Sequence, residues 1–245
     1  MGPPGGTLIP RSGYQVCGDA MADVSTSEFA AERQAMVEVI AAYVFFSSDQ
    51  TQRQRLDDRV MTAMSRVPRH QYVPDELRHV AYEDTPLPIG CGKTISQPFM
   101  VALMTDLLEV QDDEIVLEIG TGLGYQGAIL AELAKAVYTV EIISELAREG
   151  QSRLDEAGYD NVQFRVGDGA HGWPDYAPYD KIIVTAAPEL MPPMLLQQLR
   201  PGGKMVIPTG LESQQQLLVV DKDDSGRVAT REVIPVRFSP LIVSH

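Results

Sequence analysis

A glycine-rich segment at residues 116–124 carries the strongest chemical signal in the sequence. It reads Val-Leu-Glu-Ile-Gly-Thr-Gly-Leu-Gly, so an apolar stretch suited to a buried strand runs into Gly120, Gly122 and Gly124. Glycine allows positive φ and a close approach of the backbone to a ligand, and the N-terminus of a following helix offers free N–H donors. Glu141 ends the next expected strand, where its carboxylate can accept both hydroxyls of a ribose. The pattern predicts a site for a ribose-containing cofactor.

Two classes of cofactor fit such a site. Residues 122–127, Gly-Leu-Gly-Tyr-Gln-Gly, match the G-x-G-x-x-G pattern of dinucleotide-binding proteins. That match is weak by itself, and the glycines of this chain begin earlier, at Gly120. Glu118 precedes them by two positions, where it could meet the cationic end of S-adenosylmethionine through water or the backbone. Together with an expected hairpin at the end of the sheet, these features favour S-adenosylmethionine, with S-adenosylhomocysteine as product. A strand-to-helix turn without a ligand is the remaining explanation, and Glu141 argues against it.

A further carboxylate follows the third expected strand, in Gly167-Asp168-Gly169. Asp168 and the neighbouring backbone N–H suit the amino group and a ring nitrogen of adenine. Asp-Gly is common in turns, so the prediction depends on its place at the carboxyl ends of the strands, where open α/β sheets bind ligands. The predicted cofactor-binding residues are Glu118, Gly120, Thr121, Gly122, Gly124, Glu141, Ile142, Asp168, Gly169 and Thr185.

Alternating strands and helices are expected to bring these residues to one edge of a sheet. The apolar runs predict strands at 115–119, 137–142, 162–166, 181–185 and 204–208, and helices at 125–134, 144–157 and 192–199. Ser144 is expected to cap the second of these helices and Gly158 to end it. Residues 216–220 and 228–238 flank an Asp-Asp-Ser-Gly turn and predict a hairpin. We therefore expect an α/β, Rossmann-like methyltransferase sheet, parallel with an antiparallel C-terminal hairpin strand, and helices on both faces.

The N-terminal part is expected to form a helical lid over this edge. Residues 1–27 are rich in Gly, Pro and Ser without periodicity, which predicts a tail that is disordered or left over from cloning. Helices are predicted at 28–46 and 56–67, a loop at 72–94, and then a helix to about residue 109 with Ser96 as its N-cap. We divide the remainder into residues 28–110, which cover the active site, and the cofactor-binding catalytic domain at 111–245, the two forming one structural unit.

Composition and charge exclude several other functions. The chain has 245 residues, and none of its apolar stretches approaches the ~20 residues of a membrane-spanning helix. Its two cysteines and four histidines show no metal-ligand spacing, so we expect no metal site. A formal charge of −14 disfavours nucleic acid and anionic membranes as partners. No secretory signal pattern is visible, and a cytoplasmic monomer is the default expectation.

Over residues 56–242 the sequence resembles the protein-L-isoaspartate O-methyltransferase family. The matching stretches are Val67–His70, Tyr72–Pro74, Ala81–Asp84, Pro86–Gly90, Thr94–Pro98, Leu117–Gly122, Gly124–Gln126, Gly167–Gly169, Gly172–Pro174, Ile182–Pro188, Leu199–Gly203 and Pro235–Leu241. Many methyltransferases share the glycine-rich motif. Thr94–Pro98 and the closing Val-Arg-Phe-x-Pro-Leu are more particular to this family.

The resemblance implies methyl transfer to the free α-carboxylate of isoaspartyl residues, with damaged proteins and peptides as partners. The ester then collapses to a succinimide, and hydrolysis restores some normal aspartate. Ser96 and Thr94 are implied at the reacting carboxylate, and the implied substrate-binding residues are Ile95, Gln97, Val236, Arg237, Pro240 and Leu241. A carboxylate is already ionised at neutral pH and needs no general base. Alignment and partial desolvation are then the enzyme's task, for which hydroxyl groups are suited.

Departures from the family pattern leave the acceptor open. The link at 44–55 is longer than usual, Leu123 replaces a small polar residue, and Cys91 and Lys93 stand where His and Gln are common. One alternative is an O-methyltransferase for a specific peptide or a small-molecule carboxylate. Another is a cofactor-binding protein without turnover, which the intact segment around Ser96 and the three intact carboxylates argue against.

Overall fold

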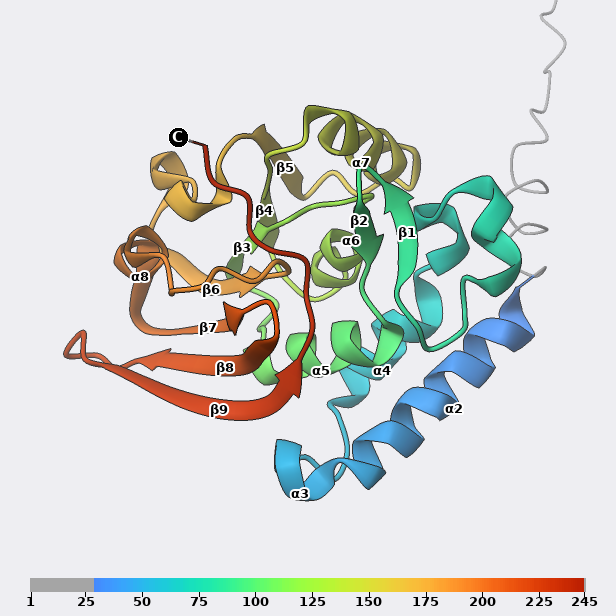
Figure 1. Ribbon diagram of the computed structural model, residues 1–245, viewed down its shortest axis with the longest axis horizontal. Coiled ribbons are helices and arrows are strands. Elements are labelled where there is room, and N and C mark those ends of the chain that lie inside the picture. The colour runs from blue at the N-terminus through green and yellow to red at the C-terminus, as the bar shows by residue number, and fades with distance from the viewer. Residues whose placement is uncertain (1–28, 245) are drawn as a thin grey trace, which may run out of the picture.

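One large mixed sheet organises the molecule, shown as a computed structural model in Figure 1. The structure describes residues 29–244, so the predicted tail at 1–27 lies outside the described residues. Seven strands of this part pair in the order β5-β4-β3-β6-β7-β8-β9. They are β3 (Ile115–Ile119), β4 (Ala136–Glu141), β5 (Val162–Val166), β6 (Tyr179–Val184), β7 (Leu199–Leu211), β8 (Gln214–Lys222) and β9 (Val228–Val236). The strands from β3 to β7 are parallel and β8 is antiparallel to both neighbours, which confirms the predicted sheet.

Helices cover both faces of the sheet, as expected. They are α2 (Ala30–Phe46), α3 (Ser48–Thr51), α4 (Asp58–Arg66), α5 (Pro98–Leu108), α6 (Tyr125–Ala131), α7 (Ser144–Glu156) and α8 (Pro193–Gln198). Successive side chains of a strand point to opposite faces, so Val116 enters the core formed with α2 and α4 to α7, whereas Leu117 enters the core formed with α8. Both side chains are fully buried, and burial of each contributes about 1.5–3 kcal/mol.

The N-terminal region contains more regular structure than the sequence predicted. The prediction of a loop at 72–94 is wrong over part of that range, because β1 (Leu87–Gly90) and β2 (Lys93–Ile95) pair as an antiparallel hairpin. The hairpin turn is tight, with positive φ at Gly90, Cys91 and Gly92. The long link after α2 holds the short helix α3. The strands β1 and β2 are too short, and their surroundings too rich in proline and glycine, to give a periodic signal in the sequence.

Two predicted helix caps are wrong. Ser96 does not cap α5, which begins at Pro98 with Gln97 at the N-cap position; the backbone N–H of Phe99 donates instead to Asp84 Oδ1, at 2.8 Å. A carboxylate distant in sequence thus replaces the local serine cap. Ser144 is already the first residue of α7 and caps nothing. Gly158, with φ +80°, follows the end of α7 as predicted.

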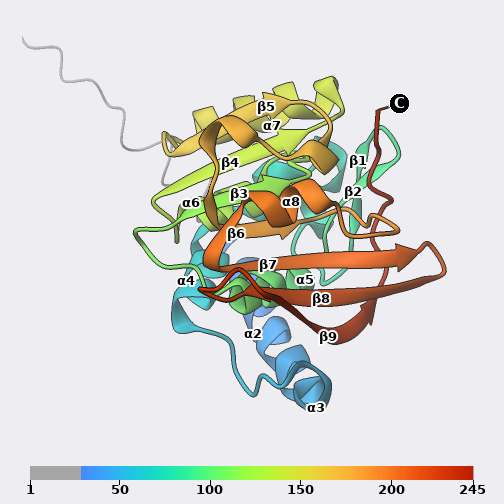
Figure 2. The ribbon, with the colours of Figure 1, turned by 90° about the vertical axis from the view of Figure 1, so that its left-hand side faces the viewer.

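The strand β7 is longer than the predicted range of 204–208. It begins at Leu199, which pairs with Tyr179, and it continues to Leu211 through pairing with β8. Figure 2 shows β7, β8 and β9 extending together along one side of the molecule. Across residues 29–244, no helix combines the length and the apolar character needed to cross a membrane.

Candidate active site

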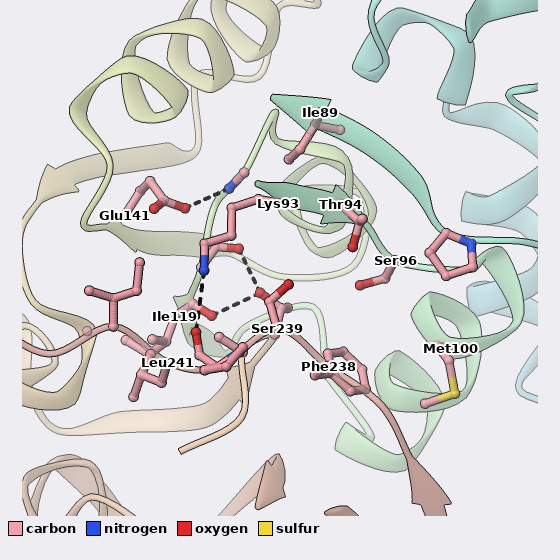
Figure 3. A pocket seen from close by; sticks show the side chains of 18 of the residues that line it. Ile89, Lys93, Thr94, Ser96, Met100, Ile119, Glu141, Phe238, Ser239 and Leu241 are labelled. Atoms are coloured by element: carbon pink, nitrogen blue, oxygen red, sulfur yellow. Dashed lines mark hydrogen bonds between the residues drawn. The ribbon is translucent and has the colours of Figure 1, made fainter. Parts of the chain in front are cut away.

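A cavity of about 540 Å³ lies at the carboxyl edge of the sheet. Its walls are the strand ends, the β1–β2 hairpin and the chain that follows β9 (Figure 3). We call residues 237–244 the C-terminal strap. Backbone hydrogen bonds from Ala187 N to Ser239 O (2.8 Å) and from Leu241 N to Ala187 O (2.9 Å) fix the strap beside the end of β6. The cavity is therefore formed by segments that lie far apart in the sequence.

The glycine-rich turn forms the floor of the cavity. Gly120 and Gly122 line it, with φ of +98° and +55°. The Thr185 hydroxyl donates to the carbonyl oxygens of Gly120 (2.8 Å) and Ile119 (3.0 Å), which ties β6 to the turn. A Cβ atom at Gly120 would lie 2.4 Å from Thr185 Oγ1. This position therefore needs glycine for both its backbone angle and its space.

Gly120→Ala is expected to weaken S-adenosylhomocysteine binding and to lower the free energy of unfolding by about 2 kcal/mol or more, since strain at positive φ adds to a steric clash. Gly158→Ala is the matched control, because Gly158 also has positive φ but no atom within 4 Å of the added Cβ. Calorimetric titration and urea unfolding measure the two effects. Equal behaviour of the two variants would contradict the role of the contact with Thr185.

Glu141 presents a fixed carboxylate to the cavity. Its side chain is buried, with Oε2 accepting from Gly122 N and Oε1 from Ile143 N, both at 3.0 Å. The first bond holds the carboxylate against the glycine-rich turn, and Figure 3 draws one hydrogen bond of Glu141 as a dashed line. Each carboxylate oxygen has further acceptor capacity for the hydroxyls of a ribose. Ile142, next in the chain, also lines the cavity.

Glu118 lies beneath the cavity rather than in its wall. The side chain is fully buried, and neither carboxylate oxygen has a hydrogen-bond partner among the described residues. Burial, together with the nearby Glu141, raises the pKa of Glu118 to about 8. A Cβ atom at Gly127 would lie 3.1 Å from Glu118 Oε2, so the last glycine of the G-x-G-x-x-G match makes room for this carboxyl group. Glu118 is therefore not among the residues that line the cavity.

The raised pKa of Glu118 has a consequence for stability. Between its ordinary pKa of 4.5 and its folded value of about 8, the folded protein holds a proton that the unfolded chain has released. The free energy of unfolding should therefore fall as pH rises through this window. Glu118→Gln is expected to abolish that fall, whereas Glu83→Gln, at an exposed carboxylate, should not. Urea unfolding at pH 5 to 8 measures the free energy of unfolding. An unchanged decline in Glu118→Gln would show that the Glu118 carboxyl is not its cause.

The other predicted cofactor residues occupy different positions. Gly169 lines the cavity, but Asp168 does not. Asp168 Oδ1 accepts from Ala170 N at 2.8 Å, and Oδ2 accepts from the backbone N–H (2.7 Å) and hydroxyl (3.0 Å) of Ser244 in the C-terminal strap. Thr121, whose hydroxyl pairs with that of Thr139, and Gly124, the N-cap residue of α6, belong to the glycine-rich turn but do not line the cavity.

The residues expected to act on the acceptor lie on two facing walls. Thr94, Ser96 and Gln97 line the side of the hairpin, while the opposite side is lined by Val236, Arg237, Pro240 and Leu241. In Figure 3 the side chains of Thr94 and Ser96 are close to each other above the strap. Ile95 is buried in the core instead of lining the cavity.

Three residues missed by the site prediction hold these walls in place. The fully buried Arg69 donates from Nη2 to Ser96 O and from Nε to Ala81 O, both at 2.8 Å, and burial lowers its pKa to about 10. Asp84 Oδ2 accepts from Gln97 Nε2 at 2.7 Å. Gln215 Oε1 accepts from Phe238 N at 2.7 Å, which anchors the strap. Arg69 and Asp84 lie in stretches that resemble the family, whereas Gln215 carried no signal.

The sequence matches known proteins along most of its length. The model of the family described as protein-L-isoaspartate(D-aspartate) O-methyltransferase matches residues 44–245. The chain belongs to this family. A protein-L-isoaspartate O-methyltransferase 1 of a Polaromonas species is 58% identical over 214 residues, which cover 87% of this chain and 91% of that protein. The Cupriavidus necator protein of the same name is 52% identical over 217 residues, covering 88% of this chain and 84% of its own length.

Solved structures agree with this assignment. A protein-L-isoaspartate O-methyltransferase superposes with a TM-score of 0.73 at 26% identity, over 85% of this chain and 65% of that one. A Plasmodium falciparum protein, described as a putative protein-L-isoaspartate O-methyltransferase, has the same fold and was solved with S-adenosyl-L-homocysteine. Its TM-score is 0.68 at 24% identity, over 76% of this chain and 91% of that one. Family membership makes this chain an S-adenosylmethionine-dependent methyltransferase.

Proposed function

We propose that this chain methylates the free α-carboxylate of L-isoaspartyl residues in damaged proteins and so starts their return to aspartate. The observation that carries the proposal is the meeting of two sets of residues in one cavity. Gly120, Gly122 and Glu141 form its cofactor side, and Thr94 and Ser96 line the wall above. A site with both sets suits the transfer of a small group between two bound molecules.

The cofactor side fits S-adenosylmethionine, which supplies the methyl group on a sulfonium centre. We assign the ribose hydroxyls to the Glu141 carboxylate and the amino acid end to the backbone around Gly120 and Gly122. Thr185 holds this turn, and the buried Glu118 precedes it in β3. Asp168 and Gly169 remain our assignment for adenine, although Asp168 then has to share or release its bonds to Ser244.

The acceptor side needs to hold an anion and exclude water, without removing a proton. An isoaspartyl carboxylate is ionised at neutral pH, so its oxygen attacks without a general base. We assign its orientation to the hydroxyls of Ser96 and Thr94, which can donate hydrogen bonds to a carboxylate oxygen. Gln97 and the strap residues Arg237, Pro240 and Leu241, with Val236, are assigned to the peptide around it.

Repair of a defined peptide tests the proposal. With S-adenosylmethionine and this protein, an isoaspartyl peptide should turn in part into the aspartyl peptide of the same sequence, and the two separate by reversed-phase chromatography. Conversion should stop when S-adenosylmethionine is omitted. An isoaspartyl peptide that remains unconverted under conditions that saturate the cofactor site would favour a specific peptide or a small-molecule carboxylate as acceptor.

The same proposal includes a monomer in the cytoplasm, with residues 28–110 and 111–245 as one structural unit. The cavity walls described above come from widely separated parts of this chain, from the β1–β2 hairpin to the C-terminal strap. The core supports the single unit, because it joins Met64 of α4 and Leu103 of α5 to Val116 of β3. Analytical ultracentrifugation would measure the mass in solution.

A further inference from the structure

The charged residues of the cavity wall sum to a positive charge, whereas the chain as a whole is negative. Its charged lining residues among the described part are Lys93, Glu141 and Arg237, so the cavity has two cations and one anion in a chain of formal charge −14. Glu141 is already held by two backbone N–H groups. The two cations stand on different walls, Lys93 on β2 and Arg237 beyond β9. An anionic ligand therefore meets a locally favourable field.

The ammonium group of Lys93 forms one long hydrogen bond with the described part of the chain. Its Nζ lies 3.5 Å from Pro240 O, at the outer limit of a hydrogen bond, and it forms no ion pair with any residue of the described part. An ammonium group has three donors. By comparison, Lys222 donates to Leu196 O at 2.8 Å and to Leu199 O at 2.6 Å. The Lys93 ammonium group therefore has donors that a ligand in the cavity could use. To use all three, it would give up only the long hydrogen bond to Pro240 O.

The position of Lys93 points to the acceptor. Lys93 immediately precedes Thr94, and Pro240 belongs to the strap, so its side chain reaches from one acceptor wall to the other. In Figure 3 the Lys93 side chain extends from the hairpin towards the strap, with Glu141 to one side of it and Thr94 and Ser96 to the other. The contact of the ammonium group with Pro240 is exposed, so a charged hydrogen bond formed there should be sensitive to salt.

We propose that Lys93 binds the acceptor directly: its ammonium group leaves the Pro240 carbonyl and pairs with the carboxylate that Ser96 and Thr94 orient. This inference rests on the proposed function and adds a residue to it. The pair holds the nucleophile in place and offsets the repulsion that a chain of charge −14 exerts on an anionic substrate. Lys93 takes no proton in the reaction, since the carboxylate is already ionised.

Steady-state kinetics of Lys93→Gln with an isoaspartyl peptide test the inference. The KM for the peptide should rise about tenfold, the scale of one charged hydrogen bond, with kcat and the dissociation constant of S-adenosylhomocysteine changed less than about twofold. Lys93→Arg should restore a low KM. The KM of the unaltered protein should also rise with ionic strength more steeply than that of Lys93→Gln. Lys135→Gln removes the same charge from an exposed site outside the cavity and should change none of these values.

The possible failures are distinguishable. A normal peptide KM in Lys93→Gln, beside an active unaltered protein, would overturn the inference and leave the proposed function standing. Weakened binding of S-adenosylhomocysteine with an unchanged peptide KM would also overturn it, by assigning Lys93 to the cofactor. Absence of methyl transfer to isoaspartyl peptide by the unaltered protein would sink the proposed function, and the role of Lys93 with it.

Discussion

Glu141→Gln is expected to weaken S-adenosylhomocysteine binding about 100-fold, because loss of the charge should weaken each of the two hydrogen bonds that we assign to the ribose hydroxyls by about 1–1.5 kcal/mol. A second effect acts in the same direction. The carboxylate accepts from both Gly122 N and Ile143 N, whereas the NH2 group of glutamine would face one of these donors. The variant therefore loses a ligand contact and loosens the turn that forms the cavity floor. Calorimetric titration measures the binding.

Glu145→Gln is the matched control for that result. It removes the same charge four residues further on, from an exposed position outside the cavity wall, and should leave binding within about twofold. Near-normal binding in Glu141→Gln would contradict the assignment of ribose to this carboxylate. A comparable loss in both variants would indicate a general effect of net charge rather than a contact.

Ser96→Ala is expected to lower kcat about 10- to 100-fold, because a carboxylate left without its orienting hydrogen bond spends less time aligned with the methyl group. The backbone should stay in place, since Arg69 binds the Ser96 carbonyl oxygen and not its side chain. Binding of S-adenosylhomocysteine should therefore be unchanged. Single-turnover methyl transfer to a saturating isoaspartyl peptide isolates the chemical step.

Ser144→Ala provides the comparison for Ser96→Ala. Ser144 is exposed at the first turn of α7, and its hydroxyl lies outside the cavity wall. This variant should transfer methyl groups at the unaltered rate. If Ser96→Ala did the same, Ser96 would have no part in orienting the acceptor, and Thr94 would be the remaining hydroxyl on that wall.

The sheet was predictable because its signals are local. Each strand from β3 to β6 is a short apolar run, and the glycines that end β3 can be read directly from the sequence. Gly120 and Glu141 could be assigned to one site because carboxyl ends of parallel strands meet at one edge. The β1–β2 hairpin escaped prediction because its strands have only four and three residues, so the alternation of the buried Leu87 and Ile89 is too short to stand out from a loop.

The supporting residues of the site could not be predicted, because their contacts cross long stretches of sequence. Ser96 looked like a helix cap by its local context, yet the N–H of Phe99 in the first turn of α5 donates to Asp84. Gln215 anchors the strap from β8, next to the edge strand of the sheet, and Ser244 binds Asp168 although 76 residues separate the two in sequence. Residue type and spacing identify side chains that suit a ligand, whereas tertiary packing decides which of them face it.

Methyl transfer from radiolabelled S-adenosylmethionine to an isoaspartyl peptide, beside the aspartyl peptide of identical sequence, tests the central claim most directly. The two peptides share composition and charge and differ only in which carboxylate of the damaged residue is free. The proposed function predicts labelling of the isoaspartyl peptide alone, as an ester that base releases as methanol. Equal labelling of both peptides, or labelling of neither by protein that still binds S-adenosylhomocysteine, would contradict it.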